Sequence, residues 1–181
     1  EGKHEMVARD RQRRMNVAAQ ALEYEKAARL RDQLEAVKSV AEGQKIISAG
    51  RGDEDVIAFA RDRDEACVQI FFIRGGRLID RENFVLEGTL DESPEQIMAS
   101  FIQLFYGSAA YIPPTILLQT EAEDMEVIRS WLGSMRGSKI ELRVPQRGQK
   151  KKLVEMVAEN AGQALAQLKA KWLADTGKTA E

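Results

Sequence analysis

The chain has 181 residues, of which 44% are hydrophobic, and its formal net charge is −2 at pH 7. This length and apolar content allow one sizeable domain plus an appendage. The small net charge argues against a protein that coats DNA through its overall charge, so any contact with nucleic acid must come from local basic patches. No apolar run is long enough to span a bilayer, and we expect no contact with membranes.

The residues that most often bind metals are scarce. The single cysteine, Cys67, lies inside an apolar run and is typical of a small buried hydrophobe. The single histidine, His4, has no cysteine or histidine neighbour with which to form a metal site. We therefore expect no metal and no other cofactor, and a reducing, cytoplasmic setting. Because the first residue is Glu1 and the chain stops in a charged tail, we also expect a fragment of a longer protein.

Residues 1–42 predict a hairpin of two helices. In the second helix, small and apolar residues recur at alternating steps of three and four, which makes a narrow seam of Ala27, Leu30, Leu34, Val37 and Ala41. The first helix follows the same rhythm, interrupted by Arg11. A hairpin of this size cannot bury enough apolar surface to be stable alone. It packs either on a partner or on its own domain, and the periodicity does not decide between them.

The same residues match a known motif. The pattern M-x-x-A-A-x-x-L-x-[F/Y]-E-x-A-A-x-x-R-D-x-[I/L] resembles the UVR motif, which occurs in the UvrB and UvrC proteins of bacterial nucleotide excision repair. Some chaperone-associated regulators of stress proteolysis also carry it. The resemblance implies that these residues and Leu30 of the seam bind a second UVR hairpin, the tail of UvrB. The residues that match the pattern are Met15, Ala18, Ala19, Leu22, Tyr24, Glu25, Ala27, Ala28, Arg31, Asp32 and Leu34.

After the hairpin, a Gly-rich polar segment at 43–54 predicts a linker. Apolar runs at 56–60 and 66–73 then predict two strands, the second apolar on both faces as in an inner strand. Gly75-Gly76 supplies the positive backbone dihedrals of a two-residue hairpin turn. Residues 78–86 return as a more polar strand.

A helix start follows at Ser93, with Pro94 at the first position and Gln96 three residues after the cap. The elements expected after this helix are a short apolar strand at 115–118, a helix at about 125–132, a strand at 140–144 and a long helix at 149–172. Three strands, then helix, strand, helix, strand and helix is the element order of the ribonuclease H-like fold.

Three segments beyond the hairpin resemble the central region of the UvrC family of excinuclease proteins. They read QIFFIRGGRLIDRENF, FIQLFYGSAAYIPPTILL and LRVPQRGQKKKLVEMVAENA. The expected fold class is therefore mixed α/β: a helical UVR hairpin followed, at 55–181, by a ribonuclease H-like mixed sheet with helices. In the family it resembles, a nuclease domain of the GIY-YIG type precedes this region, and an endonuclease domain and helix-hairpin-helix module follow it.

A nuclease of this fold needs acids from the middle of the first strand, the first helix, the end of the fourth strand and the last helix, so that they hold two metal ions. Here the interior of the first strand, 57–60, has none, and Asp55 and Asp62 stand only at its ends. Glu95 belongs to the first helical turn, where the helix dipole explains it. We therefore expect no catalytic residue and an incomplete active site. The acids that could be argued for the remaining positions are Glu121, Glu155 and Glu159.

A basic cluster surrounds the sequence PQRG near the start of the last helix. Gly148 frees the backbone at a helix start, where N–H groups and the dipole favour phosphate. The cluster is therefore either a set of DNA phosphate contacts or a solvated helix end, and the sequence leaves both open. No aromatic residue lies near it to stack on bases. Its members are Arg143, Arg147, Lys150, Lys151 and Lys152.

The resemblance implies a scaffold and partner-docking region of the UvrABC excision nuclease. On this hypothesis the hairpin binds the UvrB tail, and the degenerate domain positions DNA, bound weakly, or the flanking nuclease domains of the same chain. Two alternatives remain: a metal-dependent nuclease active in its own right, and a UVR-containing regulator of Clp-type proteolysis. Metal-dependent cleavage of plasmid would favour the first, and binding to a Clp-type ATPase the second.

Overall fold

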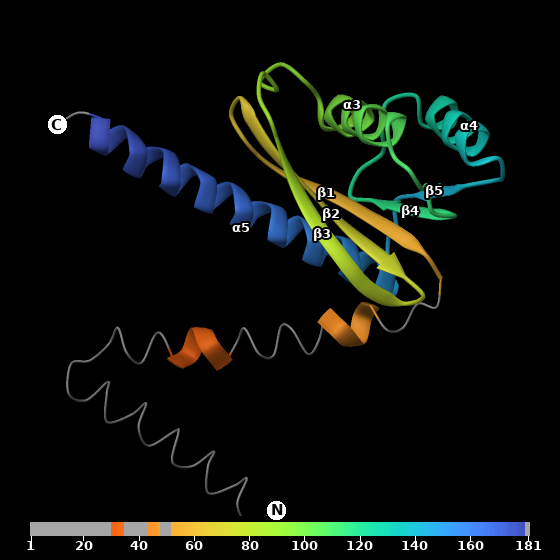
Figure 1. Ribbon diagram of the computed structural model, residues 1–181, viewed down its shortest axis with the longest axis horizontal. Helices are drawn as coiled ribbons and strands as arrows, with labels where there is room; N and C mark the ends of the chain where they lie inside the picture. The colour runs from red at the N-terminus through yellow and green to blue at the C-terminus, as the bar shows by residue number, and fades with distance from the viewer. Residues whose placement is uncertain (1–29, 35–42, 48–51, 180–181) are drawn as a thin grey trace, which may run out of the picture. The chain divides into compact units, whose positions relative to one another are not determined.

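The computed structural model describes residues 30–34, 43–47 and 52–179 (Figure 1). The chain divides into two compact units, Glu1–Gln44 and Lys45–Glu181. In the first unit, the described residues 30–34 are helical. No helix in the described part of the chain is both long enough and apolar enough to cross a membrane.

The second unit is built on one five-stranded mixed sheet, in the order β3-β2-β1-β4-β5. The first three strands form an antiparallel meander, and β4 and β5 continue the sheet parallel to β1. This arrangement confirms the predicted fold class. The strands are β1 (Glu54–Asp62), β2 (Glu65–Arg74), β3 (Arg77–Leu86), β4 (Thr115–Leu118) and β5 (Glu141–Arg143).

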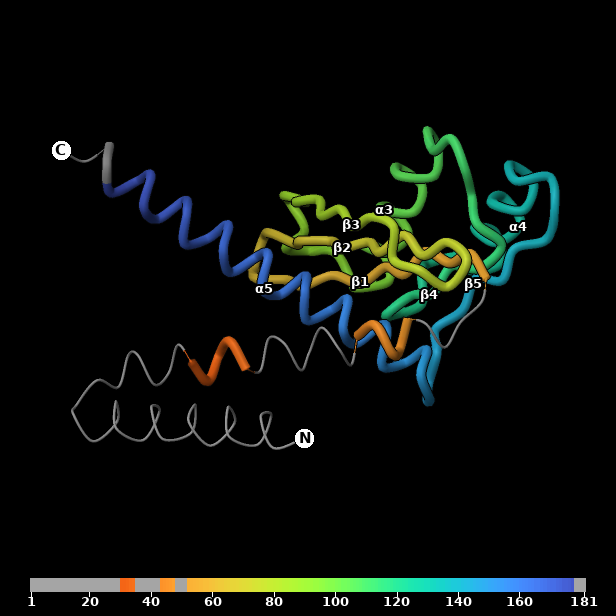
Figure 2. The backbone as a smooth tube through the Cα atoms, turned by 60° about the horizontal axis from the view of Figure 1, so that its bottom comes forward, coloured from red at the N-terminus to blue at the C-terminus, as the bar shows by residue number. Residues whose placement is uncertain are grey.

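Helices cover both faces of the sheet. α3 (Pro94–Gly107) and α4 (Met125–Arg136) lie on one face, and α5 (Gly148–Thr179) crosses the other (Figures 1 and 2). Because side chains alternate along a strand, β1 contributes to two cores. Ile57 and Phe59 pack with the α3 and α4 side chains, whereas Val56 and Ala58 pack with α5.

The predicted local signals are present. Ser93 accepts from the backbone of Gln96 while the Gln96 side chain accepts from the backbone of Ser93, a complete capping box at the start of α3. Gly75 and Gly76 have φ of 59° and 76°, which a hairpin of two left-handed residues requires. The predicted element order is confirmed throughout.

Two boundaries differ from the prediction. Within the range 43–54, residues 43–47 are helical, Ile47 is buried in the core beneath α5, and β1 already begins at Glu54. Apolar Ile46 and Ile47 override the polar composition of that segment because they contribute to the core. α5 continues to Thr179 rather than ending at Trp172, and Leu173 is exposed where the helix runs on past the sheet (Figure 2).

Candidate functional site

Two adjacent acids at the start of β1 are buried. Glu54 is 4% exposed and Asp55 1%. Neighbouring side chains of a strand point to opposite faces, so Asp55 is directed toward α3 and Glu54 toward α5. Their hydrogen-bond partners agree: Asp55 meets Tyr106 of α3, and Glu54 meets Lys150 of α5. Two carboxylates on opposite faces of a sheet cannot hold the same metal ion.

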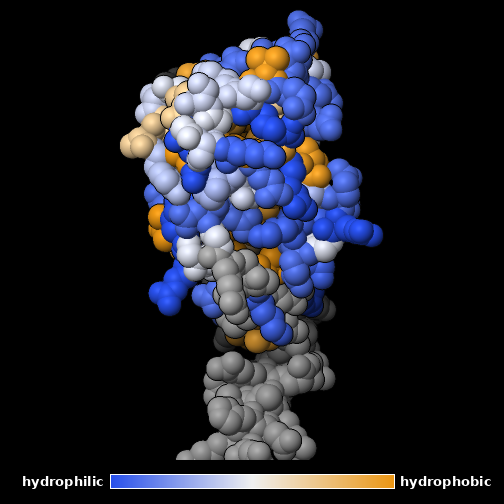
Figure 3. All heavy atoms as spheres, turned by 90° about the vertical axis from the view of Figure 1, so that its right-hand side faces the viewer, coloured by the Kyte–Doolittle hydropathy of each residue, from blue (hydrophilic) through white to orange (hydrophobic). Residues whose placement is uncertain are grey.

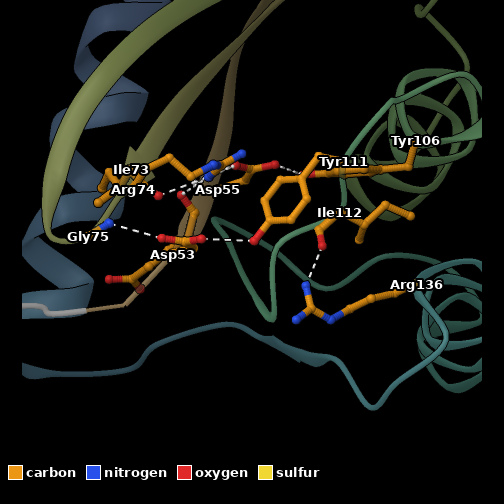
Figure 4. Close-up of polar contacts among 10 residues, drawn as sticks. Asp53, Asp55, Ile73, Arg74, Gly75, Tyr106, Tyr111, Ile112 and Arg136 are labelled. Atoms are coloured by element: carbon orange, nitrogen blue, oxygen red, sulfur yellow. Dashed lines mark hydrogen bonds and ion pairs between the residues drawn. The ribbon is translucent and has the colours of Figure 1, made fainter.

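Asp55 has a partner on each oxygen (Figure 4). The Tyr106 hydroxyl donates to Oδ2 at 2.6 Å, and Arg74 Nη1 donates to Oδ1 at 2.9 Å. Burial raises the pKa of the Asp55 carboxyl, and these two hydrogen bonds oppose the rise without cancelling it. Burial and the neighbouring carboxylate also hold the pKa of Tyr106 well above its usual value, so Tyr106 remains a neutral donor. These contacts indicate that Asp55 has a structural role.

Asp53 precedes the first residue of β1 and makes polar contacts there (Figure 4). Its carboxylate accepts from the Gly75 backbone N–H at 2.9 Å and from the Tyr111 hydroxyl at 2.8 Å. These bonds lower the pKa of Asp53. The Arg74 guanidinium lies 4.9 Å from the centre of the Tyr111 ring, a cation–π contact. The start of β1, the β2–β3 turn and the segment after α3 are thereby joined.

The place where an active nuclease of this fold would collect acids carries an amide instead. β1 and β4 are parallel with Ile57 opposite Leu118, so their carboxyl ends lie together. There the Gln119 side chain accepts from the Phe59 backbone N–H at 2.9 Å, and the Gln119 N–H donates to the Ile57 carbonyl. Asp55 lies toward the other end of β1.

The remaining acids of the nuclease alternative do not form a cluster. Asp62, at the end of β1, pairs with Lys169 of α5. Glu121 is exposed after β4, and Glu155 and Glu159 are exposed on α5, which covers the opposite face. Among the described residues, no group of three His, Cys, Asp or Glu side chains could hold a metal ion.

The structure divides the predicted basic cluster, which we call the basic turn (Arg143, Arg147, Lys150, Lys151 and Lys152). Arg143 pairs with Glu141 at 3.0 Å on the surface, and Lys150 pairs with the buried Glu54. The other three members are exposed, and no ion pair joins them to any residue that the structure describes. α5 begins directly at Gly148, whose φ is 81°. Three free cations therefore surround a helix N-terminus.

The end of the domain formed by α4 and β5 is mostly hydrophilic. In Figure 3, hydrophobic residues on this face form small separate groups rather than one continuous patch. A large contiguous apolar patch on a surface marks a site of interaction with a protein or a membrane. The face drawn in Figure 3 shows no such patch among the described residues.

Most of the predicted UVR residues, Met15 to Ala28, lie outside the described residues. Those within them are Leu30, Arg31, Asp32 and Leu34, which share one helical segment. Leu34 is 46% exposed and Leu30 is half-buried. Their role in binding a partner stays a prediction.

Sequence reasoning missed the partners of both buried acids, Glu54 and Asp55. It treated Asp55 as a strand-end residue and Lys150 as a free cation. A signal was present for the first: Tyr106 follows Ile102 by four residues on the buried face of α3, and a buried tyrosine hydroxyl needs a partner. For the second, the pair joins residues 96 positions apart, which no local pattern indicates.

Two sequence families match the chain. The family described as UvrC Ribonuclease H-like domain matches residues 53–168, and the UvrB/uvrC motif matches residues 7–40. The chain belongs to the UvrC family. Both predicted resemblances are thereby confirmed, and the match over the sheet domain weighs against a Clp-type regulator that shares only the hairpin.

Relatives agree with this assignment to the UvrC family. The chain is 49% identical to UvrABC system protein C of Acetivibrio thermocellus over 93% of its own length and 27% of that protein. It is 45% identical to the protein of the same name from Symbiobacterium thermophilum, over 92% of this chain and 27% of that protein. For Alkaliphilus oremlandii the identity is 42%, over 89% and 26%. The chain thus spans about a quarter of the length of these UvrC relatives.

Proposed function

We propose that this region serves a UvrC-family protein as a scaffold that docks a partner through its hairpin and holds DNA through its sheet domain. The UVR motif supports docking on the UvrB tail, since the matched relatives are named as proteins of the UvrABC system. The sheet domain supplies a platform on which the flanking nuclease domains of the longer protein are positioned.

The scaffold role is supported by how the acids of the sheet domain are used. Asp55 is buried and fully partnered, Asp62 is paired, and Gln119 occupies the junction of β1 and β4. Two-metal phosphoryl transfer needs convergent carboxylates with free oxygens. The described residues fit a domain that supports chemistry performed by other domains of the longer protein better than one that performs it.

The observation that carries the DNA role is the set of free cations at the start of α5. Arg147, Lys151 and Lys152 are exposed and unpaired among the described residues. The first backbone N–H groups of a helix have no intrahelical acceptor, and the helix dipole adds positive potential there. Side-chain and backbone donors thus converge on one place, and a phosphate group of the DNA backbone fits their charge. Contacts of this kind carry no sequence information.

Charge reversal tests the DNA role. The variant Arg147→Glu/Lys151→Glu should bind duplex DNA more weakly, by a similar factor for unrelated sequences and with a shallower salt dependence. The single variant Lys151→Glu has a matched control in Lys171→Glu, which makes the same charge change at an exposed lysine in the last turns of α5. An unchanged affinity and salt slope in the double variant, measured by fluorescence anisotropy across a salt series, would show that the basic turn is only a solvated helix start.

A further inference from the structure

Lys150 differs from the other lysines of the basic turn in what it contacts. Its ammonium group donates to Oε1 of Glu54, which is buried at the first position of β1. The second oxygen, Oε2, is buried without a hydrogen-bond partner in the described structure. Lys150 is thus the single charged partner that the structure gives this carboxylate among the described residues.

Separating Lys150 from Glu54 should cost free energy of folding. Glu54 is buried whereas the Lys150 side chain is 37% exposed, so loss of Lys150 would leave a buried carboxylate without its charged partner, which is destabilising. The Lys150 ammonium keeps two further N–H donors, but the Glu54 carboxylate balances its charge, so Lys150 should contribute less to phosphate binding than an unpaired lysine does. Lys150 is therefore held at the start of β1 by Glu54.

The pair lies where α5 begins. Lys150 lies in the first turn of the helix, and the nearby Leu153 and Val154 are buried against the same face of the sheet. Successive residues of a helix point about 100° apart. Lys150 points toward Glu54 and is 37% exposed, whereas Lys151 and Lys152 are exposed to solvent.

We propose that Glu54 and Lys150 form an internal anchor that selects which cations of the basic turn reach DNA: Lys150 is a positioning residue, and Arg147, Lys151 and Lys152 are the phosphate contacts. The inference rests on the proposed DNA role of the basic turn and deepens it. The sequence gives no reason to distinguish the five cations of the basic turn. The inference separates those that contact DNA phosphates from one that holds the fold.

The test compares Lys150 with its neighbour. In the 181-residue chain, Glu54→Gln/Lys150→Gln replaces the ion pair by a neutral pair of similar size, and Lys151→Gln is the matched control. With a duplex oligonucleotide as probe, Lys151→Gln should lower the salt slope by roughly one unit. The double variant should keep the wild-type slope. Glu54→Gln alone frees Lys150 and should steepen the slope. An equal loss of slope in the double variant and in Lys151→Gln would overturn the inference.

Thermal unfolding supplies a readout without DNA. Each single variant, Glu54→Gln or Lys150→Gln, should lower the unfolding temperature, and the double variant should lose less than the sum of the two. Additive losses would overturn the anchor. If the anchor couples in unfolding while no form of the chain binds DNA, the proposed DNA function fails, and the assignment of contacts fails with it. If DNA binds and Lys150 behaves like Lys151, the assignment alone fails.

Discussion

The hydroxyl of Tyr106, on α3, donates a 2.6 Å hydrogen bond to the carboxylate of Asp55, which lies 51 positions earlier in β1. Both side chains are buried. Together with the Asp55–Arg74 pair, this bond joins α3 to the central strand and satisfies an acid that would otherwise be costly to bury. An acid at the first strand of a ribonuclease H-like fold invites a catalytic interpretation, and its partners here favour a structural one.

Replacing Tyr106 by phenylalanine should destabilise the domain by about 1–3 kcal/mol, because a buried carboxylate loses a charge-assisted hydrogen bond. The aromatic ring would keep its edge-on contact with Phe105. Urea unfolding at neutral pH measures the loss. Tyr111→Phe is the control, because its hydroxyl bonds Asp53 at the exposed surface and should contribute less.

The Tyr106→Phe effect should also depend on pH. The hydroxyl bond favours the ionised form of Asp55, so its contribution is present above the folded-state pKa of Asp55 and is lost as the pH falls through it. Burial places that pKa above the ordinary value. A destabilisation that is equal at pH 3 and at pH 7 would contradict this account.

The pKa of Asp53 is shifted in the opposite direction from that of Asp55, and its contribution should be lost at lower pH. Its pKa is lowered in the folded chain by the Gly75 N–H and the Tyr111 hydroxyl. A depressed pKa gives stability that is present above the unfolded value of about 3.9 and lost as the pH falls through the folded value. The free energy of unfolding of wild type relative to Asp53→Asn should therefore grow as the pH is raised through this window. Urea titrations at several pH values measure the difference in free energy of unfolding between the two proteins. If this difference does not change with pH, the hydrogen bonds of Asp53 do not stabilise its ionised form.

The elements of the sheet domain could be predicted because each carries a local signal. The capping box at Ser93 and the Gly75-Gly76 turn act within a few residues of themselves. The two faces of β1 are less accessible to sequence reasoning, since they depend on partners from β2, α3 and α5. Asp55 lies beside the apolar interior of the strand. Its burial is explained by the hydrogen bond from Tyr106 and the ion pair with Arg74, and neither partner is near it in the sequence.

The candidate site shows the same limit. The sequence placed five cations near one turn, and the structure confirms that they lie around the start of α5. Which of them are free depends on Glu54 and Glu141, and the Glu54 contact spans 96 positions. A cluster of charged residues can be recognised from the local sequence. Which of those charges are neutralised by residues distant in the sequence can be seen only once the fold is known.

The chain should not incise DNA with Mg²⁺ or Mn²⁺. The acids that could be argued for a two-metal site are on opposite sides of the sheet, exposed on separate elements or already paired. Supercoiled plasmid incubated with the chain should remain uncut at every metal concentration. Specific incision that is lost in Glu121→Ala would show that the acids converge after all, and would favour the nuclease alternative.

The hairpin should bind a second UVR hairpin, that of the UvrB tail, through the seam that includes Leu30 and Leu34. An exposed apolar stripe is rarely left bare, and Leu34 is 46% exposed in the described helical segment. Leu30→Asp places a charge in the centre of the seam, where burial without a partner is unfavourable. We expect it to abolish binding of a UvrB tail peptide in isothermal titration calorimetry while the sheet domain keeps its unfolding temperature.

Leu173→Asp is the control for this substitution, because it adds the same charge to an equally apolar residue exposed at the far end of α5. It should bind the peptide as the wild type does, since the two compact units carry the two substitutions separately. Unchanged affinity in Leu30→Asp would place the docking surface outside the seam. Equal losses in both variants would show that added charge, and not the seam, governs the interaction.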